Sequence, residues 1–68
     1  MFTVDASKIR ELMFERGING VAEFARQAQL NGLTAAKVLK DGATATAKTI
    51  NTLAKFFGVN GNELILKE

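Results

Sequence analysis

The chain has 68 residues, of which 47% are hydrophobic, with nine basic and seven acidic side chains and neither Cys nor His. This length predicts a single domain, residues 1–68, with one small core and little volume for a small-molecule ligand. Without thiols or imidazoles we expect no disulfide, no metal, no cofactor and no enzymatic activity. Short apolar runs and an N-terminus without a basic start predict a cytoplasmic protein with no membrane span.

Two helices are predicted in the first part of the chain. The first begins at an N-cap of Asp5 or Ser7 and ends at Gly17. The second starts after the segment Ile18–Gly20, with Asn19 or Gly20 as its cap, and ends near Gln29. Their apolar side chains recur at three- and four-residue intervals: Ile9, Leu12 and Met13, then Val21, Phe24, Ala25 and Ala28. Phe14 lies outside this stripe and either packs under a loop or stays partly exposed.

Two more helices are predicted in the second part of the chain. The third runs from Asn31 or Gly32 to Lys40. The fourth is capped by Thr46 and terminated by Gly58. Together the four helices should bury a core of apolar side chains: Ile9, Leu12, Met13, Phe24, Leu30, Val38, Leu39, Ile50, Leu53 and Phe57.

The remaining segments are short. Small residues in Ala43–Ala45 predict a loop before the fourth helix. Asn60 with Glu63 predicts a capping box that starts a fifth helical element, after which Leu64 and Ile65 dock on the core. Only Phe2–Val4 and Leu64–Leu66 have a composition compatible with extended ends.

A helix-turn-helix is predicted between the second and third helices. Two helices that cross at a steep angle need a small residue where their backbones meet, and Ala25 occupies that place ten residues before Ala35. Leu30 after the turn and Val38 on the next helix complete the apolar pattern.

Positive charge is concentrated in the same part of the chain. Residues 26–55 have a net charge of +4, whereas residues 1–25 and residues 56–68 each have a net charge of −1. The charged side chains of the middle segment are Arg26, Lys37, Lys40, Lys48 and Lys55 against Asp41. Such a distribution favours contact with a polyanion such as double-stranded DNA, and the alternative is a solvated surface that lacks acids.

From Ile9 to Ile65 the chain resembles the phage repressor and Cro (XRE-like) helix-turn-helix family. The most similar stretch is Thr49–Asn60, followed by Phe24-Ala25 and Lys37–Gly42. The resemblance implies a compact all-α, five-helix, lambda-repressor-like domain that acts as a homodimer on a palindromic operator.

Two positions depart from the family pattern. The family usually has Gly with a positive φ where this chain has Gln29, so Asn31 and Gly32 are expected to form the turn instead. Ala35 stands where a large β-branched residue is usual, so either the third helix lies closer to its partner or Leu33 fills the volume.

The resemblance also implies which side chains meet DNA. Those expected to contact bases in the major groove are Asn31, Leu33, Thr34, Lys37 and Lys40. Those expected to contact phosphates, some of them also as helix caps, are Asn19, Gly20, Arg26, Thr44, Thr46 and Lys48. Arg26 could equally pair with Glu23.

An exposed apolar patch for a dimer contact is expected at Phe56, Leu64 and Leu66, unless Phe56 covers the core edge. The sequence therefore predicts a bacterial or phage-encoded regulator of transcription, such as a Cro-like repressor. An antitoxin or antirepressor that binds a protein partner through the same fold is the alternative, and salt dependence of binding separates the two.

Overall fold

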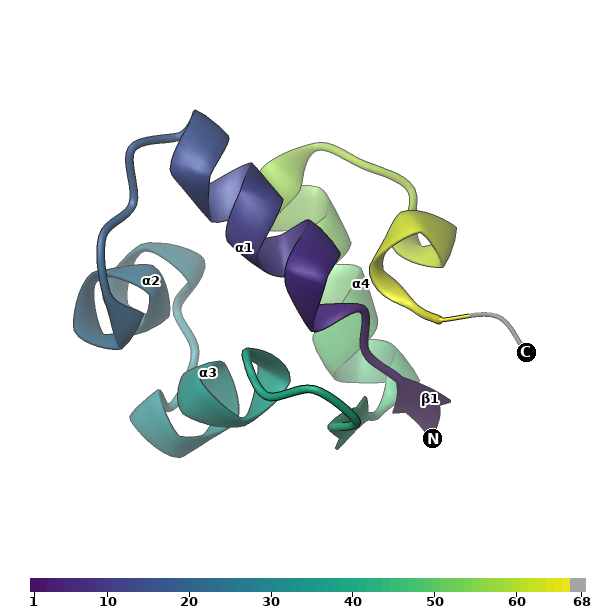
Figure 1. Cartoon of the computed structure of the whole chain (residues 1–68). Helices are drawn as coiled ribbons and strands as arrows, with labels where there is room; N and C mark the ends of the chain where they lie inside the picture. Colours follow the sequence, from purple (N-terminus) through teal and green to yellow (C-terminus); the bar gives the residue numbers. More distant parts are fainter. Residues whose placement is uncertain (67–68) are drawn as a thin grey trace.

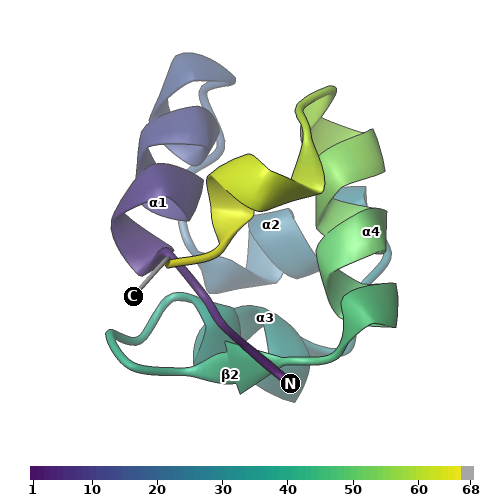
Figure 2. The ribbon, with the colours of Figure 1, turned by 90° about the vertical axis from the view of Figure 1, so that its right-hand side faces the viewer.

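The structure is a computed structural model that describes residues 1–66. Its elements follow in the order β1 Phe2–Thr3, α1 Ala6–Glu15, α2 Val21–Ala28, α3 Gly32–Val38, β2 Thr44–Ala45, α4 Ala47–Phe57 and the 3-10 helix η1 Gly61–Leu64. In Figure 2, η1 lies in front of the space between α1 and α4, and α2 lies behind it. The helix α3 lies at one end of the molecule, together with the two strands and the start of α4 (Figure 1).

The predicted starts of α1 and α4 are confirmed by their side-chain caps. The carboxylate of Asp5 accepts a hydrogen bond from the backbone N–H of Lys8 at 3.1 Å. The hydroxyl of Thr46 accepts one from the N–H of Thr49 at 3.3 Å. Because each cap satisfies a donor that the first helical turn leaves unpaired, such starts can be recognised from local sequence. Gly58 ends α4 with a φ of 69°, as predicted.

The expected count of five α-helices is not confirmed, since residues 1–66 contain four and the fifth helical segment is the short 3-10 helix η1. Its predicted capping box is present: the N–H of Asn60 donates to Glu63 Oε2 at 3.2 Å. The helix stops after Leu64 because Ile65 adopts an extended backbone and forms an antiparallel bridge with Val4. The third helix is also shorter than expected and ends at Val38 instead of Lys40.

A small sheet forms where a loop was expected. Thr44–Ala45 is the strand β2, which pairs antiparallel with β1, so that Phe2 lies opposite Ala45. On its other side the β1 segment accepts a hydrogen bond from Leu66, whose N–H donates to the Thr3 carbonyl at 2.8 Å. The predicted extended ends at Phe2–Val4 and Leu64–Leu66 therefore lie next to each other.

The core contains most of the predicted apolar side chains. Ile9, Phe24 and Leu53 are fully or almost fully buried, whereas Leu30 and Leu39 are only partly buried at its edge. Several buried residues were not predicted because they lie outside the helical repeat: Val4, Ile18 and Ala45. Leu64 is buried, as expected for a residue that docks on the core after the capping box. Phe14, outside the stripe, is 85% exposed. No helix within residues 1–66 is both long enough and apolar enough to cross a bilayer.

The turn between α2 and α3 is formed by Gln29 itself. Gln29 has φ 59° and ψ 42°, in the left-handed region, whereas Asn31 has φ −61°. The expectation that Asn31 and Gly32 take over the turn is therefore wrong. The N–H of Leu30 donates to the Ala25 carbonyl at 2.9 Å, and a helix end closed by this bond requires a left-handed residue just before the donor.

Replacing Gln29 with Gly should stabilise the domain, because Gly adopts the left-handed conformation without the steric cost to a side chain. We expect Gln29→Gly to raise the free energy of unfolding by about 1 kcal/mol in urea titrations. The matched control is Gln27→Gly inside α2, which should lower it by about 1 kcal/mol. A loss of stability in Gln29→Gly would contradict the strain assigned to this turn.

Candidate nucleic-acid interface

The helices α2 and α3 are joined by three residues and lie next to each other (Figure 1). Ala25 on α2 and Ala35 on α3 are both buried, as a close approach of two helix backbones requires. Leu33 does not fill the volume left by the small Ala35, because the Leu33 side chain is 83% exposed. The third helix thus buries only Ala35 and Val38.

The outward face of α3 and the residues just after it carry most of the side chains predicted to contact bases. Leu33, Lys37 and Lys40 are exposed, and Thr34 is partly buried. No acidic residue lies between Gly32 and Lys40. Since α3 lies at one end of the molecule (Figures 1 and 2), this face can approach a rod-shaped partner.

Asn31, predicted to contact a base, is also the N-cap of α3. Its side-chain oxygen accepts a hydrogen bond from the N–H of Leu33 at 2.8 Å and so caps α3. A bidentate contact with adenine needs both the oxygen and the nitrogen of the amide. In this arrangement the cap already uses one of the two lone pairs of the amide oxygen, so a bidentate contact would have to share that oxygen with the helix.

A shallow hollow of about 130 Å³ brings predicted base and phosphate ligands together. It lies between α3 and the segment that leads from β2 into α4. Lys37 and Thr34 line one side, while Thr44 and Thr46 line the other. Thr49, which the sequence did not single out, also lines it and contacts the Thr46 hydroxyl at 3.3 Å. The hollow therefore combines the Lys37 ammonium group with several hydroxyl groups.

At the start of α2 an acidic side chain lies where a phosphate was expected. The N–H of Asn19 donates to Glu23 Oε2 at 3.0 Å. Glu23 also forms an ion pair with Arg26, with 3.7 Å between the nitrogen and the oxygen. Gly20 caps α2 without a side chain. Two of the predicted phosphate ligands are thus already engaged by Glu23, the partner considered for Arg26 from the sequence.

Three of the four lysines of the basic segment, unlike Arg26, are not engaged by a carboxylate of the described residues. Within residues 1–66 no carboxylate lies within 4.0 Å of the ammonium groups of Lys37, Lys40 or Lys48. All three side chains are exposed. An unpaired, exposed ammonium can neutralise a phosphate without first breaking an internal ion pair.

The predicted apolar patch is smaller than expected. Leu64 is 0% exposed, so the expectation that it lies on the surface is wrong: η1 directs this side chain into the core. Phe56 is partly buried, with its ring centroid 4.9 Å from that of Phe57, and the Arg16 guanidinium lies 5.2 Å from it. Leu66 is 50% exposed.

Two helices joined by a tight turn, the second of them basic on its outward face, define a helix-turn-helix DNA-binding domain. Residues 8–65 match the family model of the Cro/C1-type HTH DNA-binding domain. The chain therefore belongs to the Cro/C1-type helix-turn-helix family. No curated protein and no solved structure matches it significantly.

Proposed function

We propose that the protein is a sequence-specific transcriptional regulator of the Cro-like or small phage-repressor type, which binds a palindromic operator as a homodimer. The observation that carries this proposal is the acid-free segment Gly32–Lys40, which comprises α3 and the two residues after it: Lys37 and Lys40 are exposed there and have no carboxylate partner in residues 1–66. Lys favours the O6 and N7 atoms of guanine, and the exposed Leu33 can contact a thymine methyl group. By occupying its operator the protein would block RNA polymerase.

Contacts with the DNA backbone would come mainly from the segment before α4. Thr44 and Thr46 line the same hollow as Lys37, and Lys48 lies in the first turn of α4. The N–H groups at the start of an 11-residue helix add partial positive charge at this place. Such contacts would hold α3 in register with the groove without selecting a sequence.

Selection of bound sequences from random duplexes at physiological salt tests the proposal. Two-fold symmetry should place the half-sites about 34 Å apart, or one helical turn. We expect an enriched palindrome with this spacing. An enriched sequence without symmetry would overturn the dimer, and no enrichment at all would overturn sequence-specific binding.

A protein-interaction module of the antitoxin or antirepressor type is the second candidate. It is favoured by Phe14, whose side chain is 85% exposed on α1. Binding to DNA should weaken with salt along a log–log slope of about −0.9 for each phosphate neutralised. Affinity that does not respond to salt would favour the protein partner.

A further inference from the structure

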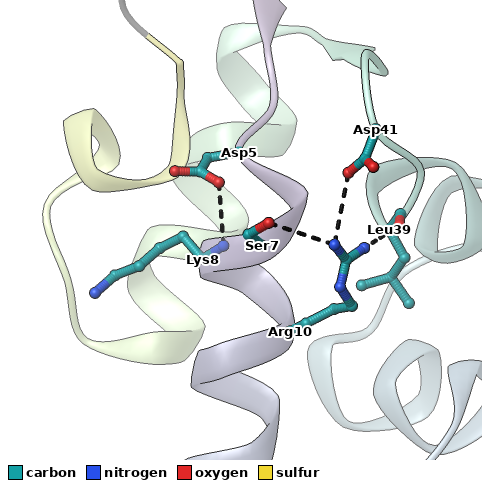
Figure 3. Close-up of polar contacts among 6 residues, drawn as sticks. All are labelled: Asp5, Ser7, Lys8, Arg10, Leu39 and Asp41. Carbon is teal, nitrogen blue, oxygen red and sulfur yellow. Dashed lines mark hydrogen bonds and ion pairs between the residues drawn. The ribbon is translucent and has the colours of Figure 1, made fainter.

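We infer that Arg10 is a positioning residue for α3, which orients the DNA-contacting helix by holding its C-terminal end on α1. This inference rests on the proposed function. Arg10 lies on α1, and its guanidinium reaches across to the residues that follow α3 (Figure 3). The Nη1 atom donates to the carbonyl oxygen of Leu39 at 2.7 Å.

The carbonyl that Arg10 contacts lies at the C-terminal end of α3. Leu39 is the C-cap of α3, with φ −92° and ψ 0°, so the helix ends without the left-handed residue that closes α2 and α4. Its last turn has instead the tighter bonds from the N–H of Leu39 to the Ala36 carbonyl and from that of Lys40 to the Lys37 carbonyl. The cation of Arg10 supplies a charge-assisted donor to the negative end of the helix.

The second terminal nitrogen of the guanidinium, Nη2, restrains the loop that follows α3. Nη2 lies 3.4 Å from the Ser7 hydroxyl and 3.5 Å from Asp41 Oδ1. Ser7 and Arg10 are on the same helix, so Ser7 helps to fix the direction of the guanidinium. Asp41 is the acidic residue nearest in sequence to Lys40, and the ion pair holds its carboxylate toward α1.

These contacts bear directly on the geometry of α3. Leu39 lies between Lys37 and Lys40 in the sequence, so the restrained carbonyl is flanked by the two lysines proposed to enter the groove. Small displacements of a helix in a groove remove base contacts, whereas phosphate contacts by long flexible side chains tolerate them. Loss of Arg10 should therefore reduce sequence selectivity more than general affinity for DNA.

The test compares Arg10→Met with Lys8→Met. Lys8 lies on the same helix but points away from Arg10 (Figure 3) and pairs with Glu63 at 3.8 Å, so its loss removes the same charge without touching α3. Affinities are measured at low temperature, where circular dichroism shows each variant folded, for a selected duplex and for a scrambled duplex of equal length. The readout is the ratio of the two affinities.

We expect the ratio to fall about tenfold in Arg10→Met and to stay within about twofold of wild type in Lys8→Met. Arg10→Lys, which keeps the charge but not the planar fork, should recover only part of the loss.

An unchanged ratio in Arg10→Met, or full recovery in Arg10→Lys, would overturn the inference while leaving the proposed function intact. Equal weakening on both duplexes, with a salt slope reduced by about one, would indicate a direct phosphate contact and also overturn it. If the wild-type protein binds the selected and the scrambled duplex with equal affinity, both this inference and the proposed sequence-specific function are contradicted.

Discussion

Replacing Phe24 with Ala is expected to lower the free energy of unfolding by about 3–5 kcal/mol and to leave much of the protein unfolded at 37 °C. Phe24 is fully buried, and its ring centroid lies 6.0 Å from that of Phe57 and 6.5 Å from that of Phe56. Truncation removes these contacts and leaves a cavity between α2 and α4 that a small core cannot close. Domains have about 0.05–0.15 kcal/mol of stability per residue, so the expected loss is a large part of the total.

The matched control for this variant is Phe14→Ala. Phe14 is 85% exposed, so its truncation should change the free energy of unfolding by less than about 0.5 kcal/mol. Both variants can be compared by urea unfolding followed by circular dichroism. Similar midpoints for the two variants would show that the aromatic cluster is not the centre of the core.

The double variant Lys37→Ala/Lys40→Ala is expected to bind the selected operator about 100-fold more weakly, with little change in melting temperature. Each side chain is exposed and makes no ion pair within the described part of the chain, so removal should cost contacts with DNA and few within the protein. Fluorescence anisotropy with a labelled duplex and thermal unfolding measure the two effects separately.

Lys8→Ala is the control for the change in charge, because Lys8 lies on α1 and pairs with Glu63 at 3.8 Å. Its affinity should stay within a few-fold of wild type, since exposed ion pairs and distant charges contribute little. Wild-type affinity in the double variant would place the DNA-binding face elsewhere.

Features that depend on neighbours along the chain could be predicted well from the sequence. The caps at Asp5 and Thr46 and the capping box at Asn60 each join residues three positions apart, and all three are present. The helical repeat of apolar residues likewise located most of the core, because it depends only on helix geometry.

Features that depend on distant partners could not be predicted in this way. Thr44–Ala45 becomes a strand only because β1 lies beside it, and Ala45 is buried there although no helical repeat includes it. At Gln29 the backbone bond from Leu30 to Ala25 prevails over the preference of a long side chain for negative φ.

The candidate DNA interface could likewise be predicted only in part. The basic character of α3 could be predicted from composition, but the engagement of Asn19 and Arg26 by Glu23 depends on side-chain directions that composition does not specify. The contact from Arg10 to Leu39 spans 29 positions of the chain and had no local signal.

The small sheet has a consequence for synthesis in the cell. Thr3 near the beginning of the chain is hydrogen-bonded to Leu66, and Val4 forms a bridge with Ile65. A nascent polypeptide cannot make these bonds until Ile65 and Leu66 have emerged from the ribosome, and closing so long a loop is slow compared with forming a helix. We therefore expect the domain to acquire its native tertiary structure, and with it any competence to bind an operator, only after residues 65 and 66 have left the ribosome.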